Sequence, residues 1–208
     1  MEQSNIMFLV FRLALSALAL SLLPSNFVWA ESTDIEVRIL AQGAKFIPGY
    51  KNSVQVTLRD QLTGHVIARG LTTGGTGDTA RILMSKRNEP RQVESDGASV
   101  FKATTDIDRP RLIEVEIHGP LHQPQVTLTA KSSRWVLPGR HITSGDGWVI
   151  ELSGLIVDLS LPVAHSFLKS DNEFKIDAGI TMLCGCNFSE GGTWDALHLE
   201  AEAFIYRD

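Results

Sequence analysis

Two cysteines near the carboxyl end of the chain are the residues whose type and spacing most directly suggest chemistry. Cys184 and Cys186 are the only cysteines in the sequence, and Gly185 separates them. On an extended strand, side chains two residues apart share a face with Cβ atoms about 6–7 Å apart, whereas a disulfide requires about 3.5–4.5 Å. A bond between the two cysteines therefore requires the strand to stop or buckle at Gly185.

Three interpretations of this pair stay open. A disulfide closing so small a ring would be strained and easily reduced, which suits thiol–disulfide exchange. Two thiolates could instead bind a metal, and Met182 on the same strand face would favour soft Cu(I) over zinc. In the third interpretation the cysteines are buried free thiols, because they continue an apolar stripe that begins at Phe174 and buried cysteine behaves as a small hydrophobe.

The segment after the cysteines is the other candidate binding surface. It joins the cysteine strand to an expected last strand, whose apolar residues alternate from Leu197 to Ile205. We expect the intervening loop to form the wall of any thiol or metal site. The candidate binding residues on it are Asn187, Glu190, Trp194 and Asp195.

Other catalytic or ligand-binding patterns are not found in the sequence. The histidines lack metalloprotease spacing, and no serine stands in a Gly-x-Ser-x-Gly motif, so we assign no catalytic residue. The glycine-rich stretch 70–78 lacks the lysine of a phosphate-binding loop, and we expect it to be a flexible or tightly turned connection. We expect the basic residues that follow it to lie in a solvated, mobile loop: Arg81, Lys86, Arg87 and Arg91.

Composition and charge limit the partners that the chain can have. The 208 residues carry a formal net charge of −5, with 43% hydrophobic and 21% charged residues, as in ordinary globular proteins. No Lys/Arg-rich run supplies the electrostatic attraction on which nucleic-acid binding depends. We therefore expect no nucleic-acid partner.

The first 30 residues are typical of a secretory signal peptide. Arg12 precedes the apolar run Leu13–Leu23, Pro24 ends that run, and Val28-Trp29-Ala30 supplies small residues at the −3 and −1 positions. We predict cleavage after Ala30 and a periplasmic or secreted protein with no further membrane span. The alternative is an uncleaved anchor, against which Arg12 and Pro24 both argue.

Period-two alternation of apolar residues predicts an all-β fold. We expect tandem Greek-key (Ig-like) β-sandwiches, one over residues 31–118 with a long 70–97 loop and one over 119–208 that carries the Cys-Gly-Cys motif. Two prolines within Gly119–Pro124 mark the expected boundary. A change of parity across Ser153-Gly154 predicts a bulge or bend there.

One hairpin also suggests a family. The stretch Val54–Asp60, followed by Thr63–Val66 and Ala68–Thr72, resembles the repeating hairpin of carboxypeptidase regulatory-like, transthyretin-type domains. That resemblance implies a β-sandwich of secreted or surface proteins that serves binding, spacing or assembly. The C-terminal half resembles no family with a known activity.

These observations favour a non-enzymatic function. We expect an exported binding or accessory protein of a bacterial-type envelope or of the extracellular space, with a protein or a glycan as partner. The alternatives are a Cu(I)-binding protein that uses Cys184, Cys186 and Met182 and a thiol–disulfide protein that uses the two cysteines, and Cu(I) is the only cofactor that the sequence suggests.

Overall fold

The computed structural model describes residues 29–84, 92–167 and 173–206, and it is all-β with a few short helices. One sheet has the order β4-β1-β7, from β4 (Phe101–Ile107), β1 (Glu31–Ala41) and β7 (Trp148–Leu152). The second has the order β3-β2-β5-β6, from β3 (Val66–Leu71), β2 (Gln55–Asp60), β5 (Arg111–Gly119) and β6 (Leu128–Val136). A separate pair is formed by β8 (Leu155–Leu161) and β9 (Asp177–Met182). The helices are α2 (Gly49–Asn52), α3 (Thr79–Met84) and the 3₁₀ turns η1 (Pro124–Val126) and η2 (Ala196–His198).

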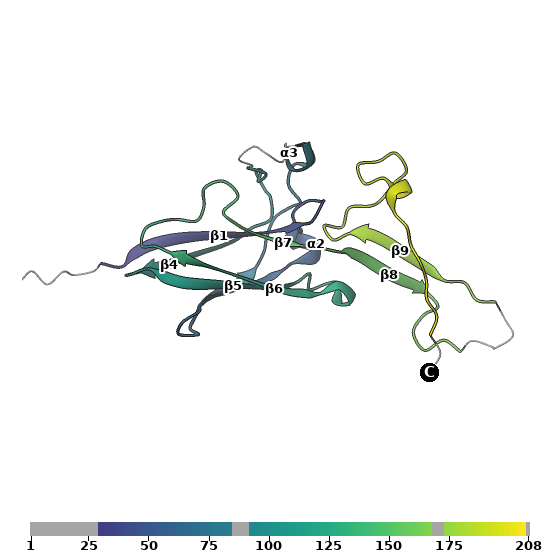
Figure 1. The fold of residues 1–208 in the computed structure, drawn as a ribbon, viewed down its shortest axis with the longest axis horizontal. Coiled ribbons are helices and arrows are strands. Elements are labelled where there is room, and N and C mark those ends of the chain that lie inside the picture. Colours follow the sequence, from purple (N-terminus) through teal and green to yellow (C-terminus); the bar gives the residue numbers. More distant parts are fainter. Residues whose placement is uncertain (1–28, 85–91, 168–172, 207–208) are drawn as a thin grey trace, which may run out of the picture.

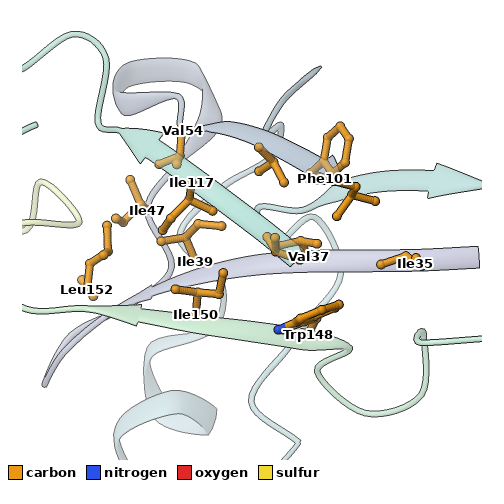
Figure 2. Packing of buried hydrophobic residues seen from close by; sticks show 14 of the residues in the cluster. Ile35, Val37, Ile39, Ile47, Val54, Phe101, Ile117, Trp148, Ile150 and Leu152 are labelled. Atoms are coloured by element: carbon orange, nitrogen blue, oxygen red, sulfur yellow. The ribbon is translucent and has the colours of Figure 1, made fainter. Parts of the chain in front are cut away.

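The main core lies between the two larger sheets. Strand β1 alternates as its sequence predicts, with Ile35, Val37 and Ile39 fully buried. Figure 2 shows side chains of β1, β5 and β7 converging on this core, with Trp148 of β7 below Val37, its partner in the register of β1. Because β1 pairs antiparallel with β4 and parallel with β7, it fixes the position of both neighbours.

The hairpin expected around residues 54–72 is confirmed as β2 and β3, which pair antiparallel. Its loop is closed by Asp60, whose carboxylate accepts the backbone N–H groups of Leu62 and Thr63 at 3.0 Å each. Gly64 lies at φ +74°, a conformation that glycine adopts without steric cost. Local turn chemistry therefore fixes this hairpin.

The predicted boundary at Gly119–Pro124 is wrong. Strands β5 and β6 lie on either side of it and pair over nine residues, from Arg111↔Val136 to Gly119↔Leu128. The two prolines lie in the connection and in η1, outside the paired strands, because proline cannot donate to a ladder. They mark a turn within one sheet and do not separate two sandwiches.

In the described part of the chain, only two strands remain for the expected second sandwich. The chain leaves β7 at Ser153-Gly154, where the strand is interrupted and Gly154 lies at φ +133°, and continues as β8. Figure 1 shows β8 and β9 projecting from one end of the sandwich. The last strand expected at 197–205 is also wrong, because in the described chain this segment is η2 followed by backbone without a sheet partner.

The expected long loop at 70–97 is partly folded. Isolated bridges join Thr73 to Val100 and Gly75 to Ala98, and α3 follows. A small separate core of Phe46, Ile82, Val93 and Ala98 packs beneath it. The stretch 70–78 is therefore held in place and is not a flexible connection; Lys86, Arg87 and Arg91 lie outside the described residues.

The predicted signal peptide lies almost wholly outside the described residues, which begin at Trp29. Across the segments that the structure describes, no helix has both the length and the apolar character that crossing a membrane would require.

Candidate functional site

The Cys-Gly-Cys motif forms a tight turn at the end of β9. The backbone N–H of Gly185 donates to the carbonyl of Met182 at 2.7 Å, and the N–H of Met182 donates to the carbonyl of Cys186 at 2.9 Å. Gly185 lies at φ +79°, which a side chain would make costly. The apolar stripe expected to run on to Cys186 therefore stops at Met182, and the buckle at Gly185 that a bond or a shared metal would require is present.

The environment of the two thiols favours a structural role. Both cysteines are free, Cys184 is 2% exposed within the main core, and Cys186 is partly buried. Burial, followed by the hydrogen bond with Cys184, raises the pKa of Cys186 to about 12. Since the thiolate is the nucleophile, a thiol held protonated at neutral pH is poorly suited to thiol–disulfide exchange.

No cluster of three or more His, Cys, Asp or Glu side chains that could hold a metal ion occurs among the described residues. The side chain of Met182, the third ligand proposed for Cu(I), is 7% exposed and packs in the main core. The Met182 sulfur could therefore bind copper only at a site inside that core.

The loop residues predicted as a binding surface hold the loop in place. The indole N–H of Trp194 donates to the carbonyl of Gly43 at 3.0 Å, which ties the loop to the turn that follows β1. Asp195 accepts the backbone N–H of Leu197 and caps η2, and this hydrogen bond is the main cause of its lowered pKa. Asn187 forms an isolated bridge with Thr181, and Glu190 is exposed.

The strands β8 and β9 carry an exposed apolar surface that was not predicted from the sequence. We call β8, β9 and the described chain up to Tyr206 the C-terminal arm; Figure 1 shows it in green to yellow, extending beyond the two larger sheets. Opposite residues of an antiparallel pair share a face. The register therefore places these side chains together on what we call the apolar face: Leu155, Val157 and Leu159 of β8, with Met182, Ile180 and Ala178 of β9.

The apolar face is covered at its root, by which we mean the end of the arm at Leu155 and Met182, and is exposed farther out. Met182 is 7% exposed because the root packs against the sandwich core, whereas Val157 is 49% and Leu159 is 60% exposed. The other face is more polar, and its Asp158 accepts a hydrogen bond from Gln125 at 2.7 Å. The outer half of the apolar face thus consists of side chains typical of a protein core, but no other part of the described chain covers them.

Further large apolar side chains are exposed on the same arm. They lie after β8, before β9 and in the unpaired final segment: Val163, Phe167, Phe174, Ile176, Leu197, Phe204, Ile205 and Tyr206. Where exposed apolar side chains lie together on a protein, they commonly mark an interaction site. Alternation at 155–161 and 174–182 signalled these strands in the sequence, but it could not say whether their apolar side would be covered.

The arm is also acidic. Its described residues include seven carboxylates, Asp158, Glu173, Asp177, Glu190, Asp195, Glu200 and Glu202, and one lysine, Lys175. Lys175 forms an exposed ion pair with Asp177 at 2.9 Å. The apolar face is therefore carried by a segment of strongly negative charge.

Comparisons of the chain with protein-family models, with curated proteins and with solved structures find no match.

Proposed function

We propose that this chain is an exported, non-enzymatic binding protein that uses its C-terminal arm to bind a protein partner. The observation that carries the proposal is the open outer half of the apolar face, at Val157 and Leu159. The two-sheet sandwich is the scaffold, and Trp194 and the buried root of β9 hold the arm to it.

Covering the apolar face supplies the driving force for binding. A two-stranded hairpin is marginally stable in water without a further strand or a packed face. Fully burying an exposed Val or Leu side chain contributes about 1.5–3 kcal/mol, and the half-exposed side chains of the arm contribute a corresponding share. A partner that packs on this face would bury the side chains that the chain itself leaves exposed.

The charge of the arm indicates the chemistry of the partner. The described residues of the arm include seven carboxylates and one lysine, so a partner with an apolar centre and a Lys/Arg-rich rim would be complementary. A second copy of the chain would bring two acidic arms together, and like charges across an interface oppose association. We therefore assign the surface to a different, basic-rimmed protein.

Export places this interaction in the periplasm or outside the cell. The support is the sequence of residues 1–30, with its apolar run and small-residue cleavage site. Amino-terminal sequencing of the exported protein should give Glu31 as the first residue, whereas a chain that retains residues 1–30 would support the uncleaved anchor.

Site-specific photo-cross-linking tests the proposed function. A benzophenone amino acid replaces Leu159 in the cells that produce the protein, and the matched control replaces Leu62, which is 74% exposed on the β2–β3 loop of the sandwich. We expect one protein to be cross-linked from position 159 and not from position 62. Equal adducts at both positions, no adduct at either, or an adduct with a second copy alone would contradict the proposal.

Cu(I) binding is a second candidate, favoured by the turn that brings the two thiols together. The hydrogen bond between Cys184 and Cys186 indicates their proximity, and thiolates and thioethers are ligands that Cu(I) prefers. Titration of the purified protein with Cu(I) against a competing chelator tests it. Loss of binding in Cys184→Ser would support this candidate, and unchanged binding would contradict it.

A further inference from the structure

A polar groove lies on the sandwich, on surface distinct from that of the C-terminal arm. It has a volume of about 910 Å³ and lies between α2, the segment 75–78, the start of α3 and the segment 95–97. The side chains that carry the inference are Tyr50, Thr76, Asp78, Arg81, Ser95 and Asp96. These elements are separated in sequence, and three sets of contacts bring them together.

The floor of the groove is built from paired backbone. Gly75 donates its N–H to the carbonyl of Gly97 at 2.6 Å, and Ser99 donates to the carbonyl of Gly75 at 2.8 Å. A third bond, from Gly49 to the carbonyl of Gly74 at 2.9 Å, attaches the helix that carries Tyr50. A Cβ at Gly74 would lie 2.8 Å from the carbonyl oxygen of Gly97, so the close approach of the two segments depends on glycine.

The base beneath the groove is held from two sides. The small core of Phe46, Ile82, Val93 and Ala98 packs below it. The carboxylate of Asp146 accepts the backbone N–H groups of Val93 and Glu94 at 2.8 and 2.7 Å. The groove therefore has preformed walls, as ligand sites generally do.

Some polar groups of the groove are already engaged. Asp78 accepts the backbone N–H of Arg81 at 2.7 Å, and its own N–H donates to the hydroxyl of Ser95 at 2.9 Å. The guanidinium of Arg81 donates to the carbonyl of Glu94 at 2.7 Å. These bonds fix the wall and, as far as the described residues go, leave one carboxylate oxygen of Asp78 for a ligand.

Other groups are free to bind. The side chains of Tyr50, Thr76 and Asp96 make no hydrogen bond to any part of the chain that the structure describes. Tyr50 is 69% exposed at the rim, so its ring offers an apolar surface and its hydroxyl a hydrogen bond. Thr76 adds a second hydroxyl and Asp96 adds a carboxylate that accepts hydrogen bonds.

We propose that this groove binds an oligosaccharide. A sugar ring has an apolar face that can pack on Tyr50 and hydroxyl groups that can donate to Asp78 and Asp96. The lining is too polar for a largely apolar ligand. Its two carboxylates outnumber the single guanidinium of Arg81, and the remaining negative charge disfavours an anionic ligand. Because the groove is open, a chain of several sugar units can lie along it.

Binding to immobilised sugars tests the inference with the full exported protein. The probes are linear tri- to hexasaccharides of glucose, of N-acetylglucosamine and of mannose, presented on an array and then measured in solution by calorimetry. We expect at least one series to bind. Retention of no member of the three series would overturn the inference.

Three variants locate the binding in the groove. Tyr50→Ala should weaken binding about tenfold or more, since aromatic anchors dominate binding sites, and Asp96→Asn should weaken it severalfold because a charged acceptor is lost. Tyr206→Ala is the matched control, because Tyr206 is 85% exposed on the arm. Equal affinity of Tyr50→Ala and the parent would overturn the inference. Equal melting temperatures of the variants establish that each is folded, and the cross-link at Leu159 stays an independent test of the arm.

Discussion

Trp194 donates its indole N–H to the carbonyl of Gly43 at 3.0 Å, across 151 positions of sequence. This bond joins the loop after the cysteines to the turn that follows β1, and Leu183 and Cys184, which precede the loop, lie in the main core. The position of the C-terminal arm relative to the sandwich therefore depends on a small set of contacts at its root.

Removal of the Trp194 indole N–H should loosen this root. Trp194→Phe keeps a large apolar ring but loses the hydrogen bond, which contributes about 0.5–1.5 kcal/mol. We expect faster amide hydrogen exchange over residues 182–198, with little change in β1 or β5. Trp135→Phe is the control, because Trp135 is 58% exposed on β6; equal exchange over 182–198 in the two variants would show that the bond does not hold the arm.

The thiol of Cys186 should react slowly in the folded protein. Because the pKa of Cys186 is raised from 9.0 to about 12, its thiolate is scarce at pH 8, and the alkylation rate should continue to rise with pH above 9. In urea the rate should instead level off about one pH unit above 9.0, the ordinary thiol pKa, where an unperturbed thiol is almost fully ionised. Mass spectrometry of iodoacetamide-treated protein measures both rates, and equally rapid alkylation of folded and unfolded protein at pH 8 would favour the thiol–disulfide alternative.

Asp60 should make the stability of the β2–β3 hairpin dependent on pH. The backbone hydrogen bond from Thr63, together with those from Arg111 and Leu62, holds the pKa of Asp60 below its ordinary value of 3.8. The stabilisation is therefore present above that value and is lost as the pH falls through the folded pKa. Asp60→Asn should lower the melting temperature most at pH 7 and least near pH 2, and a pH-independent difference would contradict this role of the charge.

Much of the sandwich could be predicted from the sequence because apolar residues recur at every second position of its strands. Ile35, Val37 and Ile39 are buried on one side of β1, and the turn residues between β2 and β3 locate their hairpin. Strand pairing was harder to predict, because two prolines signal a turn and a domain boundary equally well. Only the ladder between β5 and β6 shows that Gly119–Pro124 is a turn.

The candidate sites were less predictable for a related reason. The sequence identified Cys184 and Cys186 from their chemistry, but it could not show the burial that raises the pKa of Cys186. Alternation at Val157 and Leu159 predicted a strand with an apolar side, and only the three-dimensional structure shows that this side is open. Likewise, the groove at Tyr50 is assembled from segments that no short-range pattern connects.

The most direct measurement uses the partner protein identified by cross-linking from position 159. Its affinity is measured for three purified forms of this chain: the parent, Leu159→Asp and Leu62→Asp. Both substitutions place a charge at an exposed leucine, so neither should greatly disturb folding. We predict that Leu159→Asp weakens binding at least about tenfold, by roughly 1.4 kcal/mol, that Leu62→Asp leaves it unchanged, and that added salt weakens the parent complex. Equal affinity of all three chains would contradict the account, because the partner would then not occupy the apolar face of the arm.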